Sequence, residues 1–149
     1  MIGLQAHILC ATGSYIAFLI GFAAALMYIA QDRELKAKRM GRLFRWLPSL
    51  ETLDRVNFIA IATGFALYSA GLLLGLVAER SAFGRWTSGD PKEILSGLTW
   101  LAYAALLYVR LRASRGQRVA ILSVVGFSWL VFAFFAARFL LPSWHPFVS

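Results

Sequence analysis

Long runs of uncharged, mostly apolar residues alternate with short charged segments along this chain of 149 residues. Four runs stand out: Ile8–Ala30, Val56–Ala78, Ile94–Val109 and Val119–Ala137. Three of them have between 19 and 23 residues. About 20 helical residues, at about 1.5 Å each, cross a hydrocarbon core of about 30 Å. The shorter third run is flanked by Lys92 and Arg110, whose long side chains can extend outward to the membrane surface.

No run alternates between apolar and polar residues with a period of two, so the pattern predicts helices and not strands. We expect an all-α fold, a single domain over residues 1–149, with four transmembrane helices at approximately 6–30, 55–78, 91–111 and 118–141. Small residues recur every four positions in the first two predicted helices, and such stripes let helix backbones approach closely in lipid. They are Gly13, Ala17, Gly21 and Ala25 in the first helix, and Gly71 and Gly75 in the second.

The composition agrees with a bilayer environment, since 60% of the residues are hydrophobic, 15% are charged and the mean hydropathy is +0.68. Soluble domains are about half apolar and about a quarter charged. Of the 15 basic residues, 11 lie between the first and second runs or between the third and fourth, and 4 lie elsewhere. Because basic loops stay in the cytoplasm, we expect both termini and the 79–93 segment on the extracytoplasmic side of a bacterial cytoplasmic membrane. The net charge of +8 is therefore a topology signal, and nucleic-acid binding is not expected.

Two histidines are present, His7 at the start of the first predicted helix and His145 after the fourth. The predicted topology places both at the extracytoplasmic face. Neutral imidazole is a common axial ligand of haem iron, and two imidazoles from separate helices could hold one iron from both sides. Each histidine could instead be an interfacial aromatic residue at a helix end, and for one histidine taken singly that interpretation is favoured.

The segment from Phe83 to Trp100 also has two interpretations. Its residues are typical of a helix start, with Asp90 as the N-cap, Pro91 at the first helical position and Glu93 in a capping box. The functional interpretation is an aromatic loop, containing Trp86, that stacks on a flat porphyrin. The chemistry of the residues alone favours helix initiation.

The same segment resembles the cytochrome c assembly family, which includes the CcsA/ResC proteins. Its "WWD" haem-handling segment is similar to Asp90-Pro91-Lys92-Glu93 followed by Leu98-Thr99-Trp100-Leu101-Ala102-Tyr103. Further similarity is found in Ala6-His7, in Leu47-Pro48-Ser49-Leu50-Glu51 and in the closing Phe139-Leu140-Leu141-Pro142-Ser143-Trp144-His145. The resemblance covers essentially the whole chain, as the C-terminal portion of a longer architecture.

In that family, two external histidines flank the tryptophan-rich loop and ligate haem before its delivery to apocytochrome c. The resemblance implies a b-type haem held non-covalently as cargo, with iron ligands at His7 and His145. The other implied contacts are Trp86, Asp90, Trp100 and Arg138. It also implies three kinds of partner: a ResB-type membrane protein, apocytochrome c and a thioredoxin-like thiol reductant. In haem delivery of this kind the protein binds and positions the haem, so an independent enzymatic activity is not expected.

The chain also departs from the family pattern. Phe83, Thr87, Gly89 and Leu95 stand where the family loop has tryptophans, and Tyr108 stands where an intramembrane histidine is expected. These departures favour an alternative, a HemX-like membrane protein that regulates tetrapyrrole synthesis without transferring haem. A third alternative is a structural subunit of a membrane complex, in which only the helix packing is retained.

Overall fold

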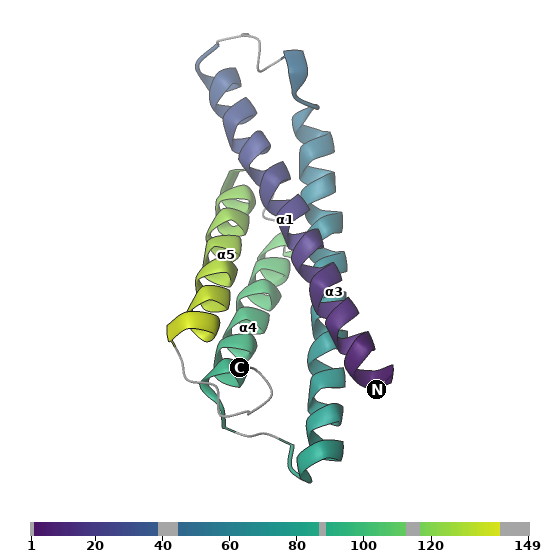
Figure 1. Ribbon diagram of the computed structural model, residues 1–149. Helices are drawn as coiled ribbons and strands as arrows, with labels where there is room; N and C mark the ends of the chain where they lie inside the picture. The colour runs from purple at the N-terminus through teal and green to yellow at the C-terminus, as the bar shows by residue number, and fades with distance from the viewer. Residues whose placement is uncertain (1, 39–44, 87–88, 113–116, 141–149) are drawn as a thin grey trace.

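A computed structural model describes residues 2–38, 45–86, 89–112 and 117–140 (Figure 1). Its elements are α1 (Ile2–Lys36), α3 (Leu50–Phe83), α4 (Pro91–Leu111), α5 (Gln117–Phe135) and η1 (Ala136–Leu140), a π-helical turn that continues α5. Four helices are long and apolar enough to cross a membrane, and the described ranges contain no strand. The prediction of an all-α protein with four such helices is confirmed.

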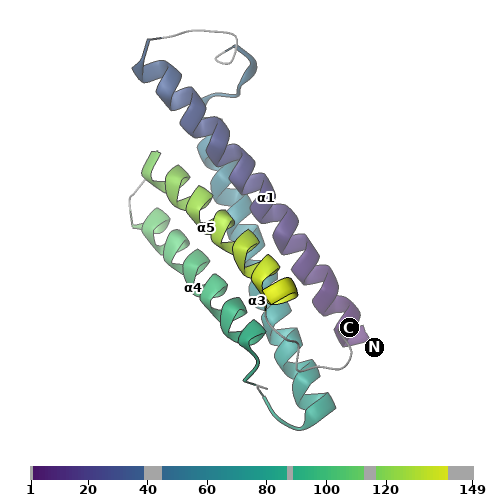
Figure 2. The same cartoon turned by 60° about the vertical axis from the view of Figure 1, so that its left-hand side comes forward.

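The helices run alternately up and down (Figures 1 and 2). α1 packs against α3 and α5, and α4 packs against the same two helices, so that α1 and α4 lie diagonally opposite each other. The start of α1, the end of α3, the start of α4 and η1 lie at one end of the bundle, which we call the His7 end. The opposite end, where α4 finishes, is called the Arg110 end.

α1 and α3 have 35 and 34 residues and are longer than the predicted spans 6–30 and 55–78. The apolar runs mark only the part of a helix that crosses lipid, whereas both helices continue into polar sequence. In the last turn of α1, Nζ of Lys36 lies 3.0 Å from Oδ2 of Asp32, and this i,i+4 ion pair stabilises the helix there. α3 begins at the N-cap Ser49, whose hydroxyl accepts from the backbone N–H of Thr52 at 3.3 Å.

The closest helix pair is α1 with α3, and small residues make this approach possible. A Cβ added at Gly64 would lie 2.7 Å from ring atoms of Phe18, and one added at Gly21 would lie 3.2 Å from Ile61. Because each added methyl group would meet the facing helix, these glycines set the separation of the two helices. Gly21 belongs to a predicted stripe, and the predicted role of that stripe in helix packing is confirmed, whereas Gly64 was not singled out from the sequence.

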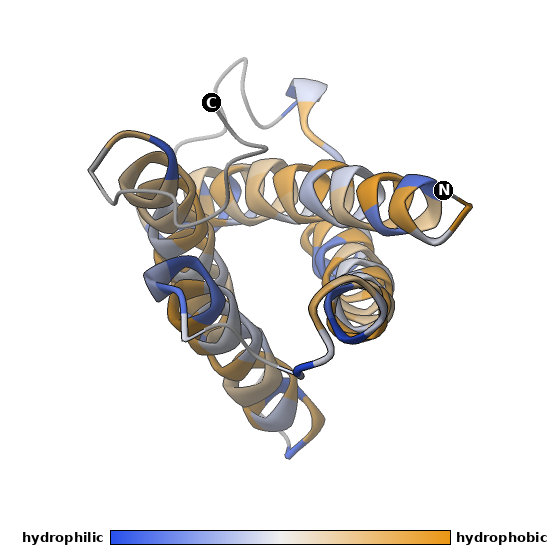
Figure 3. Cartoon of the chain, turned by 60° about the horizontal axis from the view of Figure 1, so that its bottom comes forward, coloured by the Kyte–Doolittle hydropathy of each residue, from blue (hydrophilic) through white to orange (hydrophobic). Residues whose placement is uncertain are grey.

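Aromatic side chains fill the space between the four helices. Phe18 of α1 stacks on Tyr103 of α4 with ring centroids 3.8 Å apart, and both rings are buried. Large apolar side chains also remain exposed on the outer faces, including Leu73 and Leu101, and Figure 3 shows hydrophobic positions recurring along every helix. Such exposure is typical of helices covered by lipid.

Two polar connections tie the helices together toward the Arg110 end. Arg110 of α4 donates two hydrogen bonds to the carboxylate of Asp54 on α3, and the Nη2–Oδ2 distance is 2.7 Å. The buried Asn57 amide of α3 donates to the Gly21 carbonyl of α1 at 2.8 Å and to the Ser123 hydroxyl of α5 at 3.2 Å. Each connection satisfies polar groups that lipid could not, and together they fix the register of all four helices.

Candidate functional site

His7 lies in the second turn of α1 and contacts the backbone of α3. Its Nδ1 atom is 2.6 Å from the carbonyl oxygen of Gly71. A Cβ added at Gly75 would lie 3.1 Å from Cε1 and 3.3 Å from Nδ1 of the same ring, so the imidazole rests directly on the Gly75 backbone. Two glycines one helical turn apart therefore form a seat for the ring.

The hydrogen bond to Gly71 decides which nitrogen of His7 is free. A carbonyl oxygen only accepts, so Nδ1 must carry the proton that is shared with it. In the neutral imidazole, Nε2 then has an unshared electron pair and no proton. Histidines that bind metals usually have this arrangement, in which the second nitrogen donates to a carbonyl or a carboxylate.

His7 lines a pocket of about 400 Å³ between α1, α3 and the start of α4, and we call it the His7 pocket. Pockets for small molecules commonly have 300–1,000 Å³. One wall is apolar or backbone and the rest carries charged and polar side chains. The described lining residues are His7, Leu72, Gly75, Leu76, Glu79, Asp90, Lys92, Glu93, Ser96 and Gly97. The pocket thus combines an imidazole with an apolar wall and a charged rim.

Asp90 is in the His7 pocket and also starts α4. Its carboxylate accepts from the backbone N–H of Lys92 at 3.0 Å, and only 1% of the residue is exposed. Pro91 follows as the first residue of α4. The predicted N-cap and first-turn proline are therefore confirmed, and the cap places a buried carboxylate beside the pocket.

Neither predicted tryptophan is among the described residues that line this pocket. Trp100 lies on α4, three residues beyond the lining residue Gly97. Its indole N–H donates to the Ser69 hydroxyl at 2.8 Å, and its ring lies 5.3 Å from that of Phe65, so it packs between α3 and α4. Trp86 follows the end of α3 and is 58% exposed. The guanidinium carbon of Arg80 lies 5.5 Å from the centroid of its ring.

The remaining candidates divide between the described and undescribed residues. Arg138 lies in η1 at the His7 end, is exposed, and has its guanidinium 6.0 Å from the centroid of the Phe139 ring. It is not among the described residues that line the His7 pocket. His145 lies outside the described residues. Tyr108, at the Arg110 end, is 60% exposed and faces the Arg112 guanidinium at 5.4 Å, as expected of an interfacial residue.

A second pocket of about 180 Å³ lies next to the His7 pocket, between α1, α3, α4, α5 and η1, and we call it the interior pocket. Lys92 and Ser96 line both pockets. The other described lining residues of the interior pocket are Tyr15, Tyr68, Leu95, Thr99, Leu130, Ala133, Phe134 and Ala137. Hydroxyl groups are therefore concentrated here.

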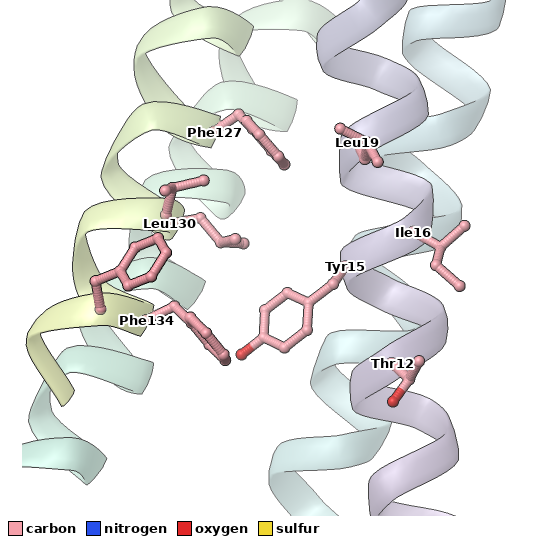
Figure 4. A pocket seen from close by; sticks show the side chains of 9 residues that line it. Thr12, Tyr15, Ile16, Leu19, Phe127, Leu130 and Phe134 are labelled. Carbon is pink, nitrogen blue, oxygen red and sulfur yellow. The ribbon is translucent and has the colours of Figure 1, made fainter. Parts of the chain in front are cut away.

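An apolar groove of about 380 Å³ runs between α1 and α5 beside the interior pocket (Figure 4). Tyr15 of α1 points toward Phe134 of α5 in this view, and their ring centroids are 6.1 Å apart with the rings nearly perpendicular. Both rings line the groove and the interior pocket, so this aromatic pair separates the two spaces.

Sequence reasoning missed several residues of the site. Gly71 and Gly75 were expected only as packing residues, yet they also seat His7. Glu79 was not singled out, and Lys92 was expected to extend outward, whereas it lines both pockets. A signal for Gly75 was present in its spacing from Gly71, but the facing residue depends on how α1 crosses α3.

The sequence model of the family described as "Cytochrome C assembly protein" matches residues 1–145. This chain belongs to the cytochrome c assembly family. The match includes His7 and His145 and confirms the resemblance that the sequence motifs indicated. No solved structure matches the chain.

Relatives with the name "Cytochrome c biogenesis protein CcsA" are similar over most of this chain. The protein from Guillardia theta is 31% identical over 160 residues, which cover 97% of this chain and 53% of the relative. A Prochlorococcus marinus protein is 30% identical over 154 residues, covering 90% of this chain and 50% of the relative. A Synechococcus elongatus protein is 44% identical over 78 residues, covering 52% and 24%. The chain spans about half the length of the first two relatives.

Proposed function

We propose that this chain acts in cytochrome c biogenesis by binding haem at the His7 end for attachment to apocytochrome c. The observation that carries the proposal is the His7 ring, whose Nδ1 is bonded to the Gly71 carbonyl and whose ring lines the 400 Å³ pocket. Membership of the cytochrome c assembly family supports the same role. In this proposal His7 and His145 would hold the haem iron.

The residues of the His7 pocket fit a flat, largely apolar ligand that contains a metal. Leu72, Leu76 and the Gly75 backbone offer an apolar wall next to the imidazole. The tautomer fixed by Gly71 leaves Nε2 as an electron-pair donor, which is what an iron ligand requires. Bound haem supplies the iron and the vinyl groups to which the apocytochrome thiols add. The contribution of the chain is to hold, orient and partly desolvate the ligand.

We also propose that the His7 end faces the extracytoplasmic side of a bacterial cytoplasmic membrane. Of the 15 basic residues, 11 lie in the two segments expected on the cytoplasmic side and 4 lie elsewhere, which supports this orientation. It places the pocket where an exported apocytochrome c, a ResB-type partner and a thioredoxin-like reductant would meet it. Relatives named as cytochrome c biogenesis proteins are consistent with such partners.

The test is the haem spectrum of the chain expressed in membranes. We expect the double variant His7→Ala, His145→Ala to lose most of the bound haem and the bis-imidazole absorption bands of the wild type. Gln5→Ala is a matched control, because Gln5 is an exposed polar residue of the same part of α1 and lies outside the pocket lining. An unchanged haem content and axial signature in the double variant would refute the proposal.

A second candidate is a HemX-like protein that regulates tetrapyrrole synthesis without transferring haem. The position of the tryptophans favours it, since Trp100 packs inside the bundle and Trp86 is not among the described pocket residues. Purification of a haem-free chain that retains an early enzyme of tetrapyrrole synthesis would support this candidate over the first.

A further inference from the structure

Lys92 is the one lysine or arginine among the described residues that line the His7 pocket and the interior pocket. It is half-buried, and its ammonium group has no hydrogen bond or ion pair within the described parts of the chain. Partial desolvation of an ammonium group is costly, and in a membrane protein such a group usually faces a ligand or another charge.

The two pockets differ in charge on either side of Lys92. The His7 pocket has three acidic residues in its lining, Glu79, Asp90 and Glu93. The described lining of the interior pocket contains no acidic residue. An anionic group is therefore less favoured among the carboxylates of the His7 pocket than beside Lys92 in the interior pocket. The Coulomb energy of such charges is larger here than in water because the surroundings are of low dielectric constant.

Hydroxyl groups in the interior pocket add to this preference. The Tyr15 hydroxyl makes no hydrogen bond within the described residues, and it is free to donate to a ligand. The Tyr68 hydroxyl donates to the Ser96 carbonyl at 3.0 Å, and the Thr99 hydroxyl donates to the Leu95 carbonyl at 2.9 Å, so those two protons are already used. The available donors in the lining are therefore Lys92 and the hydroxyls of Tyr15 and Ser96, a set suited to a carboxylate.

We propose that the interior pocket is a subsite for a carboxylate arm of the ligand in the His7 pocket, with Lys92 as its counter-ion. The inference rests on the proposed function, and it adds an orientation: the metal end of the ligand is at His7 and one acidic arm points into the bundle at Lys92. The volume of about 180 Å³ is sufficient for a short carboxylate arm. Tyr15 is the second donor to the same carboxylate.

The experiment compares protohaem, which has free propionates, with its dimethyl ester, in which both are neutral. The full chain in phosphatidylcholine nanodiscs is titrated with each, and the Soret band reports binding. Because the two ligands partition differently into lipid, the quantity of interest is the ratio of their affinities in a variant relative to wild type. A charge-assisted hydrogen bond in a partly buried site corresponds to about tenfold in affinity.

We expect Lys92→Gln to reduce the protohaem preference about tenfold while ester binding changes less than twofold. Lys92→Arg retains most of the preference, and Lys36→Gln, which removes an exposed charge at the Arg110 end, leaves it unchanged. An unchanged ratio in Lys92→Gln overturns the inference while leaving the proposed function intact. Loss of ester binding in both Lys92→Gln and Lys92→Met also overturns it, since Lys92 would then support the pocket itself. Absence of binding of either ligand to wild type overturns the proposed function instead.

Discussion

Gly75 is the position at which the seating of His7 can be tested most directly. In Gly75→Ala the added Cβ would lie 3.1 Å from Cε1 and 3.3 Å from Nδ1 of the His7 ring, both tighter than ordinary contacts. The ring must move by a few tenths of an ångström, and it must move away from α3. This displacement strains or breaks the hydrogen bond to the Gly71 carbonyl, whose length is 2.6 Å.

The expected effect of Gly75→Ala is on ligand binding more than on stability. Loss of one hydrogen bond that orients the ring corresponds to about 0.5–1.5 kcal/mol, or roughly a two- to tenfold weaker haem affinity. Replacing glycine by alanine within a helix contributes up to about 1 kcal/mol of stability, which offsets the local strain. The variant is therefore expected to unfold at a temperature close to that of the wild type.

The assay is haem titration of the purified chain, followed by the Soret band, together with thermal unfolding by circular dichroism. Gly3→Ala is the matched control, because Gly3 is also a helical glycine and a Cβ there meets no atom within 4 Å. It is expected to bind haem as the wild type does. If Gly75→Ala retains the wild-type affinity and axial spectrum, the Gly71–Gly75 seat does not orient the ligand, and the reasoning is wrong.

Three further predictions concern packing and topology. Gly64→Ala places a Cβ 2.7 Å from an aromatic ring of the facing helix, so we expect a loss of about 1–2 kcal/mol in unfolding free energy, measured in a detergent titration. Asp54→Asn leaves the Arg110 guanidinium without its carboxylate, and we expect a larger loss of about 3 kcal/mol, which should shrink when Arg110→Gln is added. With the single native cysteine replaced by serine, Arg85→Cys should react with a membrane-impermeant maleimide in intact cells, and Lys36→Cys should react only after lysis. The reverse labelling pattern would contradict the proposed orientation.

The helical architecture was predictable because its signals are local. Apolar run length determines which segments can span lipid, and the small-residue stripes identified the faces of α1 and α3 that meet. The N-cap at Asp90 was also readable, since its preference depends on neighbours within one turn. Helix ends were less accurate, because Gln31–Lys36 and the first turns of α3 are helical without being apolar.

The candidate site was predictable only in part, because its contacts join residues distant in sequence. His7 meets Gly71 and Gly75 across a gap of 64 residues or more, and this pairing depends on the crossing point of two helices. The position of Trp100 depends on which side of α4 faces α3. The similarity of Trp100 to a tryptophan of the family motif does not predict that side. Lys92 was expected to extend outward because the sequence shows only that it flanks an apolar run. The pockets that it lines depend on how four helices pack.

Gly64 packs against α1 on the face of α3 that also carries Gly71 and Gly75, the seat of the imidazole, so helix association and ligand readiness share one surface. Separation of the two helices by even a small distance would remove His7 from its carbonyl partner and abolish its fixed tautomer. By mass action, a ligand that binds only the associated state favours association in return. If haem is that ligand, as proposed, its occupancy and the association of α1 with α3 should rise and fall together, and the two helices should separate more easily in the haem-free chain.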